Sequence, residues 1–159
     1  MVKKIFKIVL IVVVVAFIAI QFKRPDRTNP PIDAKQAIEA HQTVPPPVAA
    51  VLDRSCNDCH SSKTTWPLYT QIAPVSWLVA DDVVQGRRHL NLSEWGTYDK
   101  KKRVKKLGEI CDEVTDGAMP MWQYTLIHRS AKLSPEDVKV LCGWTETEMD
   151  AIDKAAEPK

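Results

Sequence analysis

The chain has 159 residues, of which 45% are hydrophobic and 26% are charged, and its formal net charge is +2. This length allows one modest domain rather than two. Residues 1–24 hold five basic and no acidic residues, which leaves 17 basic against 20 acidic residues in the rest of the chain and disfavours nucleic acid as a partner.

Residues 1–24 have the pattern of a membrane anchor. Thirteen consecutive apolar residues, Ile8–Ile20, follow three lysines. The span suits a bilayer, whereas bulky Phe17, two residues before Ala19, disfavours cleavage as a signal peptide. A buried core helix is the alternative, but so short a chain offers little to surround it. We therefore expect an uncleaved single-pass transmembrane helix in a bacterial inner membrane, with a cytoplasmic N-terminus and the remaining chain in the periplasm.

The segment after the anchor is predicted to be a proline-rich linker. Residues 25–52 carry six prolines, which favour an extended and semi-rigid spacer, with a possible short helix over Asp33–Gln42. We expect the folded domain over residues 53–147. A polar tail follows over residues 148–159, with few apolar side chains to bury.

The hydrophobic spacing within the domain is helical, without sustained strand-like alternation. A short helix is expected from Val48 into the cysteines, and a second one after Pro74. The third is predicted over about Asp99–Thr115, with apolar residues on one face. The fourth begins at Ser134, an N-cap that is followed by a proline and, at the third position, by an acidic residue. The sequence therefore predicts an all-α domain.

Residues 56–60 form a C-x-x-C-H motif, Cys56-Asn57-Asp58-Cys59-His60. In this pattern the two thiols form thioethers with the vinyl groups of a haem, and the adjacent histidine ligates the iron. An export segment upstream agrees with this chemistry, because c-type haem is attached outside the cytoplasm in bacteria. We therefore predict one covalently attached haem c on Cys56, Cys59 and His60.

Three other interpretations of the two cysteines remain open: a redox dithiol, a zinc site and a plain disulfide. A dithiol motif usually begins a helix after a strand, and no strand is predicted here. Zinc requires four ligands, and neither Cys111 nor Cys142 belongs to a second C-x-x-C pair.

Met119 is the candidate for the sixth iron position, so that His60 and Met119 would be the two axial metal ligands. It lies in the turn Asp116-Gly117-Ala118-Met119-Pro120, which can present a thioether from a loop. Methionine also fills irregular gaps in cores, which is the structural alternative. Met121, a histidine (His41, His89 or His128) or an open position are the other possibilities.

Cys111 and Cys142 fall on the apolar faces of the third and fourth predicted helices. Outside the cytoplasm an unpaired pair of thiols tends to oxidise, so we predict a disulfide between them. Two buried free thiols are the alternative.

Several further residues are candidates for the surroundings of the haem. Arg87 or Arg88 could bind the propionates, although simple exposure is the alternative. His128 is expected to be structural. The basic run Lys100–Lys106 is either a solvated face or a docking surface for an acidic redox partner or anionic lipid. The aromatic residues that either wall the haem or pack in the core are Trp66, Tyr69, Trp77, Trp95 and Trp122.

Together, these motifs resemble a small bacterial haem-binding domain family with one C-x-x-C-H. The resemblance covers nearly all of residues 53–145 and implies a cytochrome c-like helical domain with one haem, in which Met119 stands at the family's Met-Pro methionine. Leu92 departs from the phenylalanine that is common there. Beyond C-x-x-C-H, the matching segments are Trp66-Pro67-Leu68-Tyr69, Ile72-Ala73-Pro74-Val75-Ser76-Trp77-Leu78, Gly86-Arg87, Asn91-Leu92-Ser93-Glu94-Trp95, Met119-Pro120, Tyr124-Thr125-Leu126-Ile127-His128 and Lys132-Leu133-Ser134.

These observations favour electron transfer rather than catalysis. We expect a membrane-anchored monohaem c-type cytochrome that serves an unidentified redox partner protein, because no nucleophile or acid–base pair is clustered in the sequence. The alternative is a haem-based enzyme or gas sensor whose sixth iron position is open or labile. A structural or assembly subunit of a respiratory complex is a third possibility.

Overall fold

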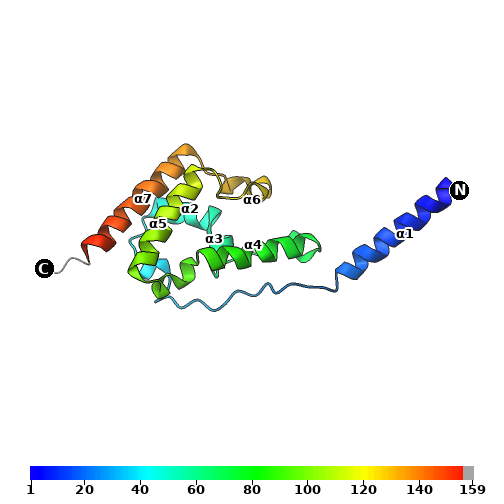
Figure 1. The fold of residues 1–159 in the computed structure, drawn as a ribbon, viewed down its shortest axis with the longest axis horizontal. Coiled ribbons are helices and arrows are strands. Elements are labelled where there is room, and N and C mark those ends of the chain that lie inside the picture. The colour runs from blue at the N-terminus through cyan, green and yellow to red at the C-terminus, as the bar shows by residue number, and fades with distance from the viewer. Residues whose placement is uncertain (156–159) are drawn as a thin grey trace.

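The computed structural model describes residues 1–155, and all regular secondary structure in this part of the chain is helical, without a strand (Figure 1). The all-α prediction is therefore confirmed. The α-helices are α1 (Val2–Ile20), α2 (Pro46–Ser55), α3 (Asn57–His60), α4 (Val75–His89), α5 (Lys100–Thr115), α6 (Trp122–Ile127) and α7 (Pro135–Lys154). Short 3-10 helices connect them: η1 (Ile38–Ala40), η2 (Leu68–Gln71), η3 (Leu92–Thr97) and η4 (Arg129–Ala131).

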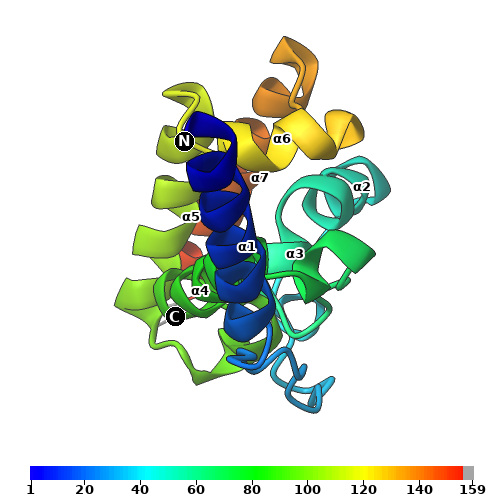
Figure 2. The ribbon, with the colours of Figure 1, turned by 90° about the vertical axis from the view of Figure 1, so that its right-hand side faces the viewer.

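The hydrophobic core lies where α5 and α7 run side by side and α2 packs against α7 (Figure 1). Trp95, Leu107 and Leu141 are fully buried there. Burying such large apolar side chains is the main stabilising contribution, at roughly 25 cal/mol per Å² of area removed from water. Beside this core, α3 lies between α2 and α4 and packs against both, and α6 packs against η4 (Figure 2).

The starts of α5 and α7 agree with the sequence prediction. The side chain of Asp99 accepts a hydrogen bond from the backbone N–H of Lys102 at 2.7 Å and caps α5. At α7, the Ser134 hydroxyl accepts from the N–H of Asp137 at 3.1 Å, and the Asp137 carboxylate accepts from the N–H of Ser134 at 2.8 Å. This capping box satisfies backbone donors that the helix itself cannot pair.

The capping carboxylate predicts a pH-dependent contribution to stability. The hydrogen bonds from Ser134 and the guanidinium of Arg54, 2.6 Å away, lower the pKa of Asp137 to about 2. A carboxyl whose pKa is lowered by folding stabilises the fold above its unfolded pKa of 3.8, and this contribution is lost as the pH falls through about 2. We expect Asp137→Asn to lower the free energy of unfolding by about 1 kcal/mol at neutral pH.

Urea unfolding at neutral pH and near pH 2 checks this prediction, because the difference between wild type and variant should shrink in acid. Asp150→Asn is the matched control, since it removes only an exposed pair with Lys154. A deficit of Asp137→Asn that persists unchanged in acid would show that the charge is not responsible.

The boundaries at both ends of the domain differ from the prediction. Ile38 and Val48 are each 2% exposed, so the second half of the predicted linker belongs to the core. Prolines 46 and 47 open α2, where a backbone N–H has no helical partner and proline therefore costs little. The helix expected over Asp33–Gln42 is only the turn η1. At the other end, residues 148–154 continue α7, and Glu148 is buried.

The predicted anchor forms α1, which projects from the domain with no buried residue (Figure 1). Its first two turns contain Lys3, Lys4 and Lys7. Within residues 1–155, however, no helix is both long enough and apolar enough to cross a membrane, so the predicted transmembrane helix is not supported.

Candidate functional site

A cavity of about 540 Å³ lies between α4 and α5, and the turn of α3 and the loop before α6 complete its wall. The four residues selected from the sequence, Cys56, Cys59, His60 and Met119, all line it. They come from two segments about sixty residues apart in the sequence, and the fold places the side chains of both segments in the wall of one cavity. The cavity size falls within the range of roughly 300–1,000 Å³ that is usual for cofactor sites.

Cys56 lies between α2 and α3, and Cys59 lies within α3. We call residues 56–61, where the sequence predicts haem attachment, the attachment turn. Neither is in a disulfide, so the two thiols are free. Burial raises the pKa of Cys56 to about 12 and that of Cys59 to about 11. A redox dithiol needs an accessible thiolate, and these raised pKa values disfavour that alternative. Nor does any group of three or more potential metal-binding side chains occur in residues 1–155, so nothing there supports a zinc site.

His60 is oriented for metal binding by its hydrogen bonds. Its Nδ1 lies 3.0 Å from the carbonyl oxygen of Gly86 and 3.2 Å from that of Leu90. Carbonyl oxygens only accept, so Nδ1 must carry the proton, and the lone pair is then on Nε2. Burial lowers the pKa of His60, which favours the neutral imidazole. A neutral ring whose other nitrogen is held by a backbone carbonyl is the form that ligates metals.

Gly86 allows α4 to approach the attachment turn closely. A Cβ atom at this position would lie 2.6 Å from the carbonyl oxygen of Cys59 and 3.1 Å from its carbonyl carbon. No side chain fits there without a shift of the backbone, so the absence of a Cβ brings the carbonyl of Gly86 within reach of His60.

Met119 is presented by the loop that ends α5. Gly117 adopts a φ of 70°, a left-handed conformation that favours glycine and terminates a helix. The N–H groups of Ala118 and Met119 both donate to the carbonyl oxygen of Glu113 at 3.0 Å. Met119 packs against the hydrophobic core and also lines the cavity. Met121, two residues later, lines the same cavity. Both methionines therefore remain within reach of one cavity.

A polar network fixes α6, the helix after this loop, to the attachment turn. The hydroxyl of Tyr124 donates to the carboxylate of Asp58 at 2.7 Å, and burial together with Asp58 raises the pKa of Tyr124. The ring of His128 stacks on Tyr124 with 4.4 Å between centroids, and its Nε2 lies 2.6 Å from the hydroxyl of Tyr69. His128 is thus engaged in structure, as predicted. Sequence reasoning missed Tyr124, although it opens one of the matching segments.

The other candidates for the haem surroundings lie elsewhere in the described chain. Within residues 1–155, Tyr124 is the one tyrosine, tryptophan or phenylalanine that lines the cavity. None of the five aromatic residues proposed from the sequence lines it. Trp95 is in the core and Trp122 is 70% exposed. The guanidinium of Arg87 donates to Ser61, Thr64 and the linker residue Asn29 rather than into the cavity. The basic residues on the wall are instead Lys105, Lys106 and His89.

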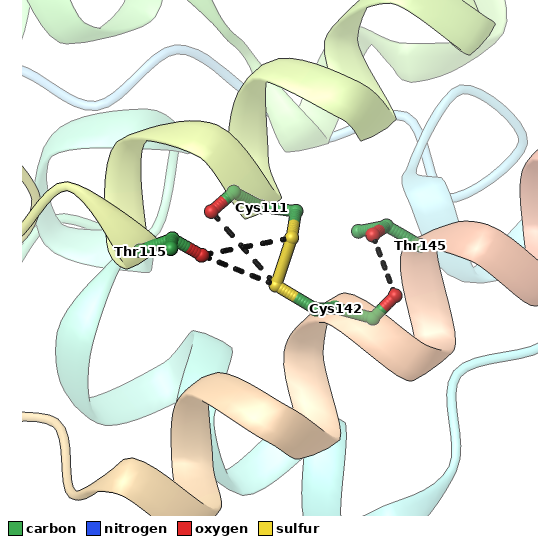
Figure 3. The surroundings of a disulfide bond; sticks show 4 residues. All are labelled: Cys111, Thr115, Cys142 and Thr145. Atoms are coloured by element: carbon green, nitrogen blue, oxygen red, sulfur yellow. Dashed lines mark hydrogen bonds between the residues drawn. A yellow bond between two sulfur atoms is a disulfide. The ribbon is translucent and has the colours of Figure 1, made fainter.

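The predicted disulfide between Cys111 and Cys142 is confirmed, and it joins α5 to α7 (Figure 3). The hydroxyl of Thr115 lies 3.6 Å from the sulfur of Cys142, and the hydroxyl of Thr145 donates to the backbone oxygen of Cys142 at 2.9 Å. The Met119 loop lies within the chain segment that this bond closes.

One comparison with known proteins supports haem binding by this chain. A family model described as a haem-binding domain matches residues 15–147. No curated protein and no solved structure matches the chain. The residues fit a haem on the structure's own terms, because two free thiols, a histidine with an available nitrogen and a methionine thioether line one cavity.

Proposed function

We propose that this chain, which belongs to the haem-binding domain family, is a monohaem c-type cytochrome that transfers single electrons. When bound, haem supplies an iron that changes its oxidation state by one electron. The observation that carries the proposal is the arrangement of Cys56, Cys59, His60 and Met119 around one cavity.

Each thiol of the attachment turn would hold the haem by adding across one of its vinyl double bonds. The sulfur of Cys56 or Cys59 would bond to one vinyl carbon and its hydrogen would go to the other, so that the addition needs no oxidant or reductant. The free state of both thiols supports this chemistry, because a disulfide would first have to be reduced.

His60 and Met119 are the residues that would ligate the haem iron. The hydrogen bonds at Nδ1 hold the ring of His60 and leave Nε2 available. The core contacts of Met119 and the hydrogen bonds to Glu113 keep the thioether in the cavity wall without a change of fold. Methionine as the second ligand raises the reduction potential and blocks exogenous ligands, which suits an electron carrier.

Met119→Ala tests the ligand assignment. We expect the oxidised holoprotein to lose its weak long-wavelength methionine-to-iron band, the reduction potential to fall, and the reduced protein to bind carbon monoxide at least tenfold faster because a position on iron opens. Optical spectra of the oxidised, reduced and carbon monoxide-treated protein are the measurement.

Met121→Ala is the matched control, because it removes a neighbouring thioether from the same cavity. It should leave the band and the slow carbon monoxide reaction of the wild type in place. If the wild type itself lacks the band and binds carbon monoxide readily, the protein belongs instead with haem enzymes or gas sensors.

The redox partner is proposed to dock beside the cavity, next to the Met119 loop. Trp122, Leu126 and Ile127 of α6 are 57–70% exposed and form an apolar surface close to that loop. The basic run of α5 reaches the cavity wall at Lys105 and Lys106. Lys105 and Lys106 both pair with Glu109, so the charge offered to an acidic partner comes mainly from the earlier part of the run, Lys101–Arg103.

We further propose that α1 attaches the chain to the inner membrane and that the haem domain lies in the periplasm. The large apolar side chains of α1 from Ile5 to Ile18 are 48–68% exposed, and none contacts the core. An exposed apolar helix of this kind requires a covering partner, and lipid is the simplest one. Haem attachment to C-x-x-C-H outside the cytoplasm supports the same side for the domain.

A further inference from the structure

A second exposed apolar surface lies at the corner of the domain nearest to α1. It consists of Leu68, Ile72, Val75 and Leu78, which belong to η2, the turn after it and the start of α4. Their exposed fractions are 79%, 45%, 40% and 55%. We call these four residues the corner patch. None of them lines the haem cavity, so the proposed electron transfer does not account for their exposure.

The end of α1 is fixed to this corner by side-chain hydrogen bonds. The amide of Gln21 donates to the carbonyl oxygen of Ala73 at 3.0 Å and accepts from the N–H of the same residue at 2.9 Å. Arg27 donates to the carbonyl oxygen of Thr70 at 2.7 Å. The apolar helix therefore leaves the domain at the corner patch, and exposed Phe22 lies on the chain between them.

The polar residues of the corner suit an interface between water and lipid. The indole N–H of Trp77 donates to the carbonyl oxygen of Lys23 at 2.6 Å, and the ammonium of Lys23 lies 5.7 Å from the centre of the indole ring. Tryptophan with its polar edge satisfied and basic residues close by are typical of membrane interfaces. Residues 61–80 contain no acidic side chain, and the acidic residues that flank this segment are Asp26, Asp58, Asp81 and Asp82.

We propose that the corner patch lies against the lipid surface and holds the haem domain in one orientation on the membrane. The inference rests on the proposed attachment of α1 and adds a second contact to it. Continuity carries the argument, because the apolar surface of α1 and the corner patch meet at the hydrogen-bonded junction of Gln21 and Ala73. α6 borders η2 through the hydrogen bond between His128 and Tyr69, but it carries the surface proposed for the redox partner and is expected to stay exposed to water.

The test uses the full-length holoprotein in vesicles of phosphatidylethanolamine and phosphatidylglycerol. Three variants carry a nitroxide label on one added free cysteine: Val12→Cys on α1, Leu68→Cys in the corner patch and Leu126→Cys on α6. Each replaces an exposed residue, and the haem spectrum verifies folding. The accessibility of each label to a water-soluble nickel complex and to oxygen is measured by electron paramagnetic resonance.

We expect the labels at positions 12 and 68 to be protected severalfold from the nickel complex and open to oxygen, as in lipid, while the label at 126 stays open to the nickel complex. Protection at 12 with equal accessibility at 68 and 126 overturns the corner contact and leaves the attachment of α1 in place. Free access of the nickel complex at all three positions overturns the attachment itself.

Discussion

Gly86→Ala is expected to lower the free energy of unfolding by about 2 kcal/mol and to reduce the yield of haem-loaded protein severalfold. The new Cβ would lie 2.6 Å from the carbonyl oxygen of Cys59, which is backbone and cannot swing aside. Separating α4 from the attachment turn would also break the hydrogen bond between the Gly86 carbonyl and Nδ1 of His60. The haem content per chain and urea unfolding are the two measurements.

The sign of the effect makes this test decisive. Alanine is normally favoured over glycine inside a helix by about 1 kcal/mol. Gly143, in α7, has no atom within 4 Å of the position of a Cβ, so Gly143→Ala should stabilise the fold by about that amount. If Gly86→Ala were as stabilising as this control, the close approach of α4 to the attachment turn would be wrong.

Removal of the disulfide, with Cys111→Ala and Cys142→Ala combined, is the second large effect. The bond joins residues 31 positions apart, and a loop of that length restricts the unfolded chain by about 3–4 kcal/mol in the chain-entropy description. We expect the free energy of unfolding to fall by that amount, because the unfolded chain of the variant is no longer restricted by the bond between α5 and α7. Urea unfolding of the oxidised holoprotein is the measurement.

Two comparisons separate the contribution of the disulfide to stability from that of the residues packed around it. Wild-type protein treated with a thiol reductant should unfold at the same urea concentration as the double variant, since thioethers resist such reductants. Thr115→Ala keeps the bond and removes only the hydroxyl beside the sulfurs, so it should stay close to wild type. A double variant as stable as the oxidised wild type would mean that packing alone holds the two helices.

The sequence was most informative where local chemistry decides the structure. The start of α7 follows from Ser134 and Asp137, because a capping box is made by residues three apart. The C-x-x-C-H motif places Cys56, Cys59 and His60 on one helical turn, because its residues are only three or four positions apart. Met119 could be selected because a glycine before it and a proline after it mark a loop.

Long-range contacts account for what could not be predicted. Nothing local indicates that Tyr124 reaches Asp58, 66 residues away, or that Gly86 must admit the carbonyl of Cys59. Arg87 has the chemistry of a propionate partner, but its donors are taken by residues of the attachment turn and the linker. Pro46 and Pro47 favour both a spacer and the first turn of a helix, and only the burial of Val48 distinguishes the two.

The hydrogen bonds between residues 21–29 and the domain also determine how electrons would be delivered. A flexible chain of the length of residues 21–36 has an r.m.s. end-to-end distance of about 20 Å, which would let a tethered carrier search the space around its anchor. Gln21, Arg27 and Asn29 remove that freedom by bonding to the domain. In the proposed function, the haem domain would then be a stationary relay, whose rate of electron transfer would depend on the concentration of a diffusing partner rather than on the motion of a tether.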